Sequence, residues 1–321
     1  SSIFRVKDGQ IVIGPESVGA LPGPACFGRG GKEATITDAS LLLGLLDPMS
    51  YFGGGMGLDL ARAEAAVMAN VADPLGVDLG TALLSMSDAF EAKIAEELHR
   101  CTTVSSDTVM MAFGGAGPLN ACGVAEKAGI SRVAVPAMAA VFSAYGIGSC
   151  DVSQRYVVGL ETYDTACLNA TLDTLNVKAA RDMFAEGFEP GSYTILAQLV
   201  ALTDAGEVVR PLTEGADFPT ELAGATSVEL ELSAIKSLRQ GDTGHIAVTR
   251  KAAAKAAEHR TVLVPEKGRI DLPVYALGSL KKGDFAAGPA ILEEDYFTAR
   301  VPAGWGFVVS EAGDVILDRE G

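Results

Sequence analysis

MAFGGAGPLNACGVAEKAGI, residues 111–130, is the stretch that most directly indicates the fold. The run VMMAF at 109–113 predicts a buried strand, and the residues from Leu119 to Ala128 predict a helix. Between them, three glycines occupy four positions around an alanine. Glycine permits positive φ angles and lets a ligand approach the backbone closely. Because the amides at the start of a helix attract anions, the pattern is typical of a turn that faces a nucleotide.

The spacing of the glycines leaves a second interpretation open. Gly114, Gly115 and Gly117 fit neither GxGxxG nor GxxxxGK[ST], and no lysine follows directly to reach a β-phosphate. A tight turn that only packs the helix against the sheet explains the pattern as well. From the residues alone, both phosphate binding and simple packing remain.

Around this turn, the sequence predicts an α/β protein in three successive parts. The N-terminal part combines a hairpin about Lys7-Asp8-Gly9 with helices at 58–70 and 78–100 and with the strand–turn–helix unit. A long amphipathic helix and a strand follow, and then short apolar β runs separated by Gly and Pro. The three parts are an N-terminal α/β domain at 1–160, a helix–strand connecting region at 161–224, and a smaller, mostly β C-terminal domain at 225–321.

Composition excludes several classes of function. Hydrophobic residues make up 48% of the 321 and aromatic residues only 6%, which is typical of an α/β protein. A net charge of −16 provides no basic surface for nucleic acid. The sequence shows neither the roughly 18 apolar residues of a membrane span nor a signal peptide, so we expect a soluble, cytoplasmic protein. The five scattered cysteines and three separated histidines favour free thiols and no zinc or histidine metal site.

A second Gly/Pro-rich stretch, the loop at 14–38, is the other candidate site. Arg29 could neutralise phosphate oxygens, and Asp38 could hold Mg²⁺ through water. The alternative is structural, because Thr37 or Asp38 is suited to cap the apolar helix that follows and Arg29 to be a surface charge. Cys26 lies in the same loop with no histidine near it in sequence, which favours a buried thiol over a nucleophile.

Four stretches resemble the A-type subunit of the hydantoinase/5-oxoprolinase/ketone-carboxylase family, in that family's order and spacing. They are GPESVGALPGPACFGRGGKEATITDA (14–39), FGGAGPLNACGVAEKAGI (113–130), VFSAYGIGSCDVSQRY (141–156) and GPAILEEDYFTARVPAGWGFVV (288–309). The resemblance implies an ATP-dependent enzyme with an actin- and sugar-kinase-like, ribonuclease-H-like fold, in which ATP lies between two similar lobes. It also implies that residues 1–160 are the second of these lobes.

The same resemblance implies cofactors and partners. ATP and Mg²⁺ are the expected cofactors. The acidic-glycine-threonine phosphate motif of the family's first lobe is absent here, so that lobe is expected from another polypeptide or has been lost. A B-type subunit and a small-molecule carbonyl substrate are the other expected partners.

By resemblance, Gly114, Gly115, Ala116 and Gly117 line the adenosine and phosphate side of the ATP cleft. The family usually has His where this chain has Asn120. Because Asn cannot take up a proton near neutral pH, Asn120 either contacts the nucleotide through hydrogen bonds or only packs its helix.

Three functions are compatible with the resemblance. We favour a subunit of a multi-subunit ATP-dependent ketone carboxylase of the acetone/acetophenone type, which helps to phosphorylate a carbonyl or enol oxygen, because a family chain without one lobe suggests a complex of divided polypeptides. A subunit of an ATP-dependent cyclic amide hydrolase of the hydantoinase/5-oxoprolinase type fits the same motifs. The third alternative is a non-catalytic scaffold derived from such an enzyme, which Asn120 and the lack of a nucleophile–base pair favour. No catalytic residue is assigned.

Overall fold

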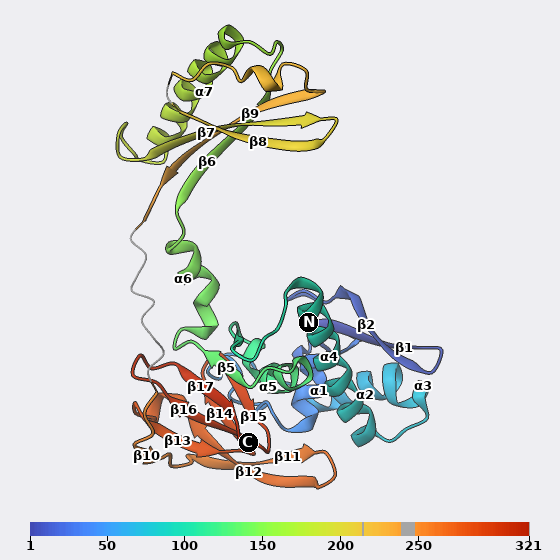
Figure 1. Cartoon of the computed structure of the whole chain (residues 1–321). Helices are drawn as coiled ribbons and strands as arrows, with labels where there is room; N and C mark the ends of the chain where they lie inside the picture. The colour runs from blue at the N-terminus through green and yellow to red at the C-terminus, as the bar shows by residue number, and fades with distance from the viewer. Residues whose placement is uncertain (214, 239–247, 321) are drawn as a thin grey trace. The chain divides into compact units, whose positions relative to one another are not determined.

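A computed structural model of the protein describes residues 1–213, 215–238 and 248–320 (Figure 1). The chain forms two compact units, Ser1–Ala144 with Gly244–Gly321, and Tyr145–Thr243. These boundaries differ from the three successive parts that the sequence predicts. Because the second unit is an insertion in sequence, the C-terminal segment belongs to the same unit as the first 144 residues.

The largest sheet of the first unit joins two strands from residues 109–135 with four strands from the C-terminal part of the chain. Its order is β10-β13-β16-β17-β5-β4, and Figure 1 shows the red C-terminal strands beside the green β5. β17 pairs antiparallel with β5, with Leu317 opposite Val133, and β4 pairs parallel with β5. The strands are β4 (Val109–Met111), β5 (Arg132–Val135), β10 (Ala252–Ala253), β13 (Asp284–Ala287), β16 (Trp305–Val309) and β17 (Val315–Arg319).

This sheet corrects the expectation of a separate C-terminal domain at 225–321. The C-terminal strands share one core with the strand–turn–helix unit, in which Val133, Leu317 and Trp305 are at most 1% exposed. Burial of these apolar side chains stabilises the unit, and strands of four or five residues cannot form such a core alone. The sequence pattern located the strands but not their pairing partner.

Two smaller sheets complete the described β structure of the first unit. The predicted N-terminal hairpin is confirmed, because β1 and β2 pair antiparallel with Lys7 opposite Gln10; β3 pairs with the other edge of β1. The second small sheet has the order β11-β12-β14-β15. The strands are β1 (Ser2–Lys7), β2 (Gln10–Ser17), β3 (Ala34–Thr35), β11 (Glu258–Val264), β12 (Gly268–Ala276), β14 (Ala290–Glu294) and β15 (Phe297–Val301).

The helices of the first unit agree with the predicted positions. The helix predicted at 78–100 is α4 (Leu79–Cys101), whose N-cap Asp78 accepts a 3.0 Å hydrogen bond from the Thr81 amide. α4 packs against α5. The remaining helical segments up to the unit boundary and in the C-terminal part are α1 (Ile36–Leu43), α2 (Leu60–Val67), α3 (Asp73–Leu75), α5 (Gly117–Ala128), α6 (Phe142–Gly148), η1 (Ala25–Phe27), η2 (Met68–Ala72), η3 (Ala139–Val141) and η5 (Leu277–Ser279).

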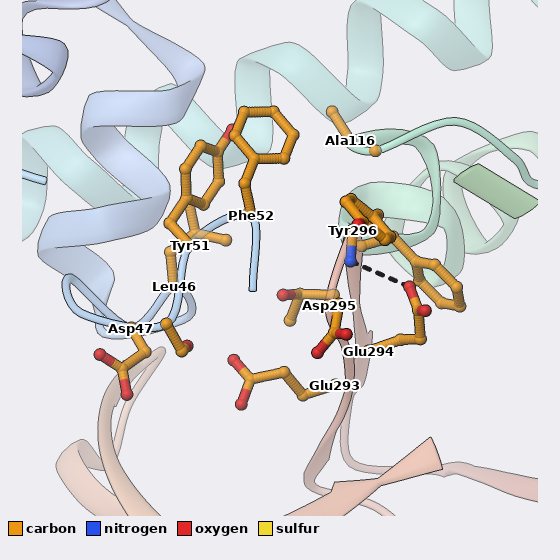
Figure 2. A pocket seen from close by; sticks show the side chains of 13 residues that line it. Leu46, Asp47, Tyr51, Phe52, Ala116, Glu293, Glu294, Asp295 and Tyr296 are labelled. Carbon is orange, nitrogen blue, oxygen red and sulfur yellow. Dashed lines mark hydrogen bonds between the residues drawn. The ribbon is translucent and has the colours of Figure 1, made fainter. Parts of the chain in front are cut away.

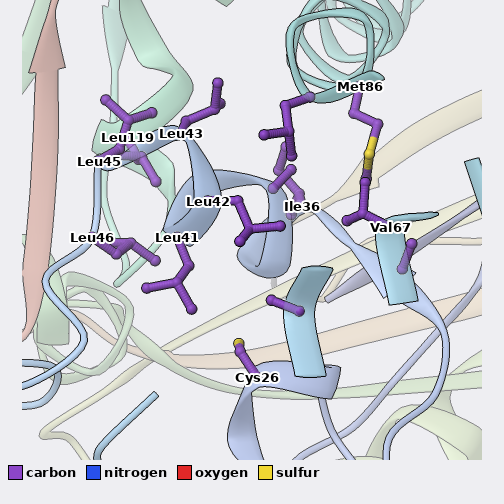
Figure 3. Close-up of a cluster of buried hydrophobic side chains, with 14 of the residues drawn as sticks. Cys26, Ile36, Leu41, Leu42, Leu43, Leu45, Leu46, Val67, Met86 and Leu119 are labelled. Carbon is purple, nitrogen blue, oxygen red and sulfur yellow. The ribbon is translucent and has the colours of Figure 1, made fainter. Parts of the chain in front are cut away.

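A second core of the first unit surrounds α1 (Figure 3). Leu41 and Leu43 of α1 and Leu45 after it are each 2% exposed, and Met86 of α4 is fully buried beside them. A helix that is apolar around most of its circumference lies inside a fold. The loop before α1 and the loop after it are therefore both anchored to the interior.

The second unit has a core of its own. α7 (Thr165–Ala185) packs on the sheet β6-β9-β7-β8, and Leu168, Leu199 and Leu230 between them are fully buried. The segment at 161–224 is thus part of a compact α/β unit rather than a simple connection. Its other elements are β6 (Val152–Gly159), β7 (Thr194–Thr203), β8 (Gly206–Leu212), η4 (Thr220–Leu222) and β9 (Ser227–Lys236).

Candidate functional site

The glycine turn, residues 114–117, joins β4 to α5 at the surface of the first unit. Gly115–Gly117 are exposed, and Gly114 has a φ of +80°, a left-handed conformation that favours glycine. Within the described part of the chain, no side chain caps α5, and Pro118 occupies its first turn. The amides at this helix start are therefore open to an acceptor from outside.

A hollow of about 100 Å³ lies against this turn (Figure 2). Gly115 and Ala116 form one wall, the turn between β14 and β15 forms another, and the loop after α1 with Tyr51 and Phe52 forms a third. A Cβ atom on Gly115 would lie 3.2 Å from the Tyr296 carbonyl oxygen, so a side chain here would narrow the hollow. Pockets that hold small ligands measure about 300–1,000 Å³, so this hollow by itself is smaller than such a pocket.

All the charged side chains that line the hollow are acidic. Arg260 donates two hydrogen bonds of 3.0 Å to the Glu293 carboxylate and lies 3.6 Å from that of Asp47. Glu294 accepts a 2.9 Å hydrogen bond from the Tyr296 amide (Figure 2). Because carboxylates repel phosphate, a phosphate group at the turn needs additional positive charge. The four acidic residues of the lining are Asp47, Glu293, Glu294 and Asp295.

Asp38 lies in the interior, where it organises the loop at 14–38. One carboxylate oxygen accepts the Cys26 amide at 2.7 Å, and the other accepts the Thr35 amide at 3.0 Å and its hydroxyl at 2.7 Å. The N-cap of α1 is Thr35 and not Thr37 or Asp38 as predicted; Asp38 is the third helical residue and completes a capping box. With 0% exposure and both oxygens engaged, Asp38 has a structural role, and the interpretation as a Mg²⁺ ligand finds no support in this geometry.

Cys26 is fully buried next to Asp38. Burial, reinforced by the neighbouring Asp38 carboxylate, raises the pKa of the Cys26 thiol well above its usual range. Because the thiolate is the nucleophilic form, this thiol is unreactive. The sequence-based preference for a buried thiol agrees with this position.

The remaining candidate residues do not line the hollow beside the glycine turn. Arg29 is exposed in the loop after η1, and its guanidinium is not among the groups around Gly115. Asn120 is 6% exposed and lies within the buried part of α5. Of the predicted cofactor contacts, the structure thus places only Gly115 and Ala116 in the wall of the hollow, with Gly114 and Gly117 flanking them in the same turn.

The described residues contain no group of three or more His, Cys, Asp or Glu side chains placed to hold a metal ion. The carboxylates of the hollow are distributed instead in pairs with Arg260 and with backbone amides. We assign no metal ligand in this chain.

A buried ion pair between α4 and β15 was not predicted from the sequence. The Arg300 guanidinium donates to the Glu91 carboxylate at 3.0 Å, and Glu91 is 5% exposed. Burial raises the pKa of Glu91, although Arg300 opposes that shift. Gly123 makes room for the pair, since a Cβ atom there would lie 2.1 Å from the Glu91 carboxyl carbon. The only feature of the sequence that could have indicated this pair is Glu91, an acidic residue within the apolar pattern of the helix at 78–100.

A comparison with known protein families finds one match, to the N-terminal part of the chain. Residues 1–156 match the family described as Hydantoinase/oxoprolinase. This match agrees with the resemblance to that family shown by the stretches at 14–39, 113–130 and 141–156. The match contains both the loop at 14–38 and the glycine turn.

Individual relatives include subunits of several enzymes. The chain is 28% identical to the acetophenone carboxylase gamma subunit of Aromatoleum aromaticum over 96% of its length, and 27% identical to the caprolactamase subunit alpha of Pseudomonas jessenii over 95%. It is also 28% identical to the acetone carboxylase beta subunit of Xanthobacter autotrophicus over 92%. It covers 48%, 49% and 47% of these proteins, so the chain spans about half the length of the curated relatives it matches.

Solved structures support the fold. A nucleotide-free acetone carboxylase structure superposes with a TM-score of 0.80 at 21% identity, covering 99% of this chain and 51% of that one. The ATP-dependent caprolactamase of Pseudomonas jessenii gives a TM-score of 0.71 at 25% identity, covering 100% and 52%. These likenesses confirm a mixed α/β fold. Among the described helices, none combines the length and apolarity needed to cross a membrane.

Proposed function

We propose that this chain is part of a multi-subunit, ATP-dependent ketone carboxylase of the acetone/acetophenone type, in which it helps to bind ATP and to phosphorylate a carbonyl or enol oxygen. The observation that carries the proposal is the exposed glycine turn beside a partial hollow. Similarity to acetophenone and acetone carboxylase subunits supplies the reaction class.

The proposed fold of the first unit is the second lobe of an actin- and sugar-kinase-like ATPase. The strand–turn–helix arrangement of β4, the glycine turn and α5 supports it, because such a junction exposes backbone amides at the end of a strand. In this assignment the C-terminal strands belong to the lobe, since they extend the same sheet.

The residues of the turn have a positioning role in this proposal. The open amides of Gly115–Gly117 at the start of α5 would hold and orient the phosphates of ATP, which would supply the phosphoryl group when bound. The missing side chain at Gly115 leaves room for the nucleotide between α5 and Tyr296. Because every charged side chain of the lining is acidic, the positive charge that phosphoryl transfer requires would have to come from Mg²⁺ and partner residues.

The small size of the hollow supports a site shared between polypeptides. About 100 Å³ cannot enclose a nucleotide, and the chain covers only about half of its relatives. We propose that the first ATPase lobe, which closes over ATP, corresponds to the half that this chain does not cover. A B-type subunit then completes carbon–carbon bond formation on the phosphorylated carbonyl substrate.

The second candidate is a subunit of an ATP-dependent cyclic amide hydrolase. Similarity to the caprolactamase subunit alpha and to its solved structure favours this alternative. In that case the turn would hold ATP for phosphorylation of a lactam or imide oxygen. Water would then attack the activated carbon, the ring C–N bond would break and phosphate would leave.

Substrate-dependent ATP consumption by the assembled complex separates the two candidates. A carboxylase consumes ATP with acetone or acetophenone only when bicarbonate is present, whereas a hydrolase consumes it with a lactam or hydantoin regardless of bicarbonate. Bicarbonate-independent turnover of a cyclic amide would contradict the first proposal. An assembled complex that consumes ATP with none of these substrates would contradict both and favour a scaffold.

A further inference from the structure

β4 is a free edge of the six-stranded sheet. Among the described strands it is the last in the order β10-β13-β16-β17-β5-β4. The amides of Ala112 and Gly114 donate toward the β5 side, to the carbonyls of Ala134 at 2.8 Å and Ala139 at 2.7 Å. Successive amides of a strand point to opposite sides, so the amides of Met111 and Phe113 point away from β5. This edge carries backbone groups ready to pair with another strand.

The side chains along this edge are unusually apolar for an exposed strand. Val109, Met111 and Phe113, which we call the β4 edge, are 44%, 49% and 42% exposed. They alternate with Met110 and Ala112, which pack into the core that α5 covers. Proteins protect exposed strand edges with charged residues, prolines or bulges, and the three positions of the β4 edge have none of these.

The exposed apolar surface continues beyond the strand. Met138 is 46% exposed and Val141 is 58% exposed, and both lie next to Ala139, to which the glycine turn is hydrogen-bonded. Phe113 also contacts the Phe142 ring, with 5.2 Å between centroids. A contiguous exposed apolar patch of this kind marks an interaction site.

We propose that the β4 edge binds an extended segment of the polypeptide that supplies the half of the relatives not covered by this chain. The segment adds a strand to the sheet, receives hydrogen bonds from the Met111 and Phe113 amides, and covers the β4 edge with apolar side chains at alternate positions. This inference rests on the proposed function in one respect: it assumes that the partner polypeptide exists.

The position of β4 in the chain favours this occupant over a second copy of the chain. β4 ends three residues before the glycine turn, so a strand added at this edge brings its own chain to the incomplete hollow. The chain covers 48% of the acetophenone carboxylase gamma subunit, which leaves a length comparable to its own for the partner. A second copy would add another acidic lining and leave the hollow without cationic groups.

The test uses, as the probe, the polypeptide from the same genome that aligns with the uncovered part of the acetophenone carboxylase gamma subunit. Its affinity for the chain is measured by calorimetry for the wild type, Met111→Lys and Val12→Lys. Val12 is a matched control, because it is 41% exposed on the edge strand β2. We expect Met111→Lys to bind at least tenfold more weakly and Val12→Lys to bind as the wild type does.

Hydrogen exchange on the wild-type complex tests the same contact without a substitution. The amides of Met111 and Phe113 should exchange at least tenfold more slowly in the complex than in the free chain. Unchanged exchange at both amides, equal binding by Met111→Lys, or a homodimer that Met111→Lys dissociates would overturn the proposal. ATP binding by the complex is measured separately. If these amides exchange more slowly but the complex does not bind ATP, only the proposed function is contradicted. If the complex binds ATP but the amides exchange as in the free chain, only this inference is contradicted.

Discussion

The glycine turn at 114–117 and the loop at 14–38 are both rich in glycine, yet their polar groups are used in opposite ways. In the loop, Asp38 is fully buried and accepts hydrogen bonds from Cys26 and Thr35. At the glycine turn, the amides that begin α5 have no side-chain cap and face a hollow. A glycine-rich sequence therefore predicts an unusual backbone conformation but not its role. That role depends on whether the backbone amides are hydrogen-bonded within the chain, as in the loop, or left open, as at the glycine turn.

The largest effect should come from removing the carboxylate that closes the loop. Asp38→Ala leaves the Cys26 and Thr35 amides and the Thr35 hydroxyl without their buried acceptor. We expect the free energy of unfolding to fall by about 3 kcal/mol or more, measured by urea denaturation. Asp59→Ala is the matched control, because Asp59 caps α2 at an exposed position and its loss should cost about 1 kcal/mol. Equal losses of unfolding free energy in Asp38→Ala and Asp59→Ala would contradict the buried, structural role given to Asp38 in the loop.

A paired glycine substitution sharpens the comparison. A Cβ atom at Gly31 would lie 2.2 Å from the Gly23 carbonyl oxygen, whereas one at Gly115 would lie 3.2 Å from that of Tyr296. We expect Gly31→Ala to cost about 2–3 kcal/mol of stability, because two backbone segments must move apart. Gly115→Ala should cost less than about 1 kcal/mol. Thermal or urea unfolding measures both losses of stability. A larger loss for Gly115→Ala than for Gly31→Ala would contradict the description of the loop as packed and the turn as open.

A further difference between the buried loop and exposed positions concerns thiol reactivity. Burial and the Asp38 carboxylate raise the pKa of the Cys26 thiol, so it stays protonated as the pH rises through the range in which exposed thiols ionise. We expect iodoacetamide to modify the exposed Cys101 and Cys150 readily, and Cys26 to react roughly 100-fold more slowly at every pH from 7 to 9. Peptide mass spectrometry measures the rates. Modification of native Cys26 as fast as Cys101 would show that the loop is open.

Periodicity and turn chemistry predicted most individual elements correctly. The apolar spacing at 78–100 identified α4, and Lys7-Asp8-Gly9 identified the β1–β2 hairpin, because both depend on interactions close in sequence. The pairing of β17 with β5 joins residues about 180 positions apart, and no local pattern encodes it. The C-terminal strands were therefore placed in a separate domain.

The candidate site was predictable only in part. The glycines between a predicted strand and helix identified the turn but left binding and packing both open, and the structure leaves that turn exposed. Asp38 was interpreted as a possible metal ligand because its sequence context does not show that the Cys26 amide, twelve residues away, reaches its carboxylate. The pair of Glu91 and Arg300 was missed for the same reason, since it joins distant segments in the interior.

The central claim is that the exposed amides of the glycine turn bind ATP once the partner polypeptide completes the hollow. The most direct measurement is the affinity of the assembled complex for ATP with wild-type chain, Gly115→Val and Gly278→Ala. Gly278 is an exposed glycine of the same unit where an added Cβ atom meets open space. We predict at least a tenfold loss of affinity for Gly115→Val and none for Gly278→Ala, and equal affinity in all three complexes would contradict the claim.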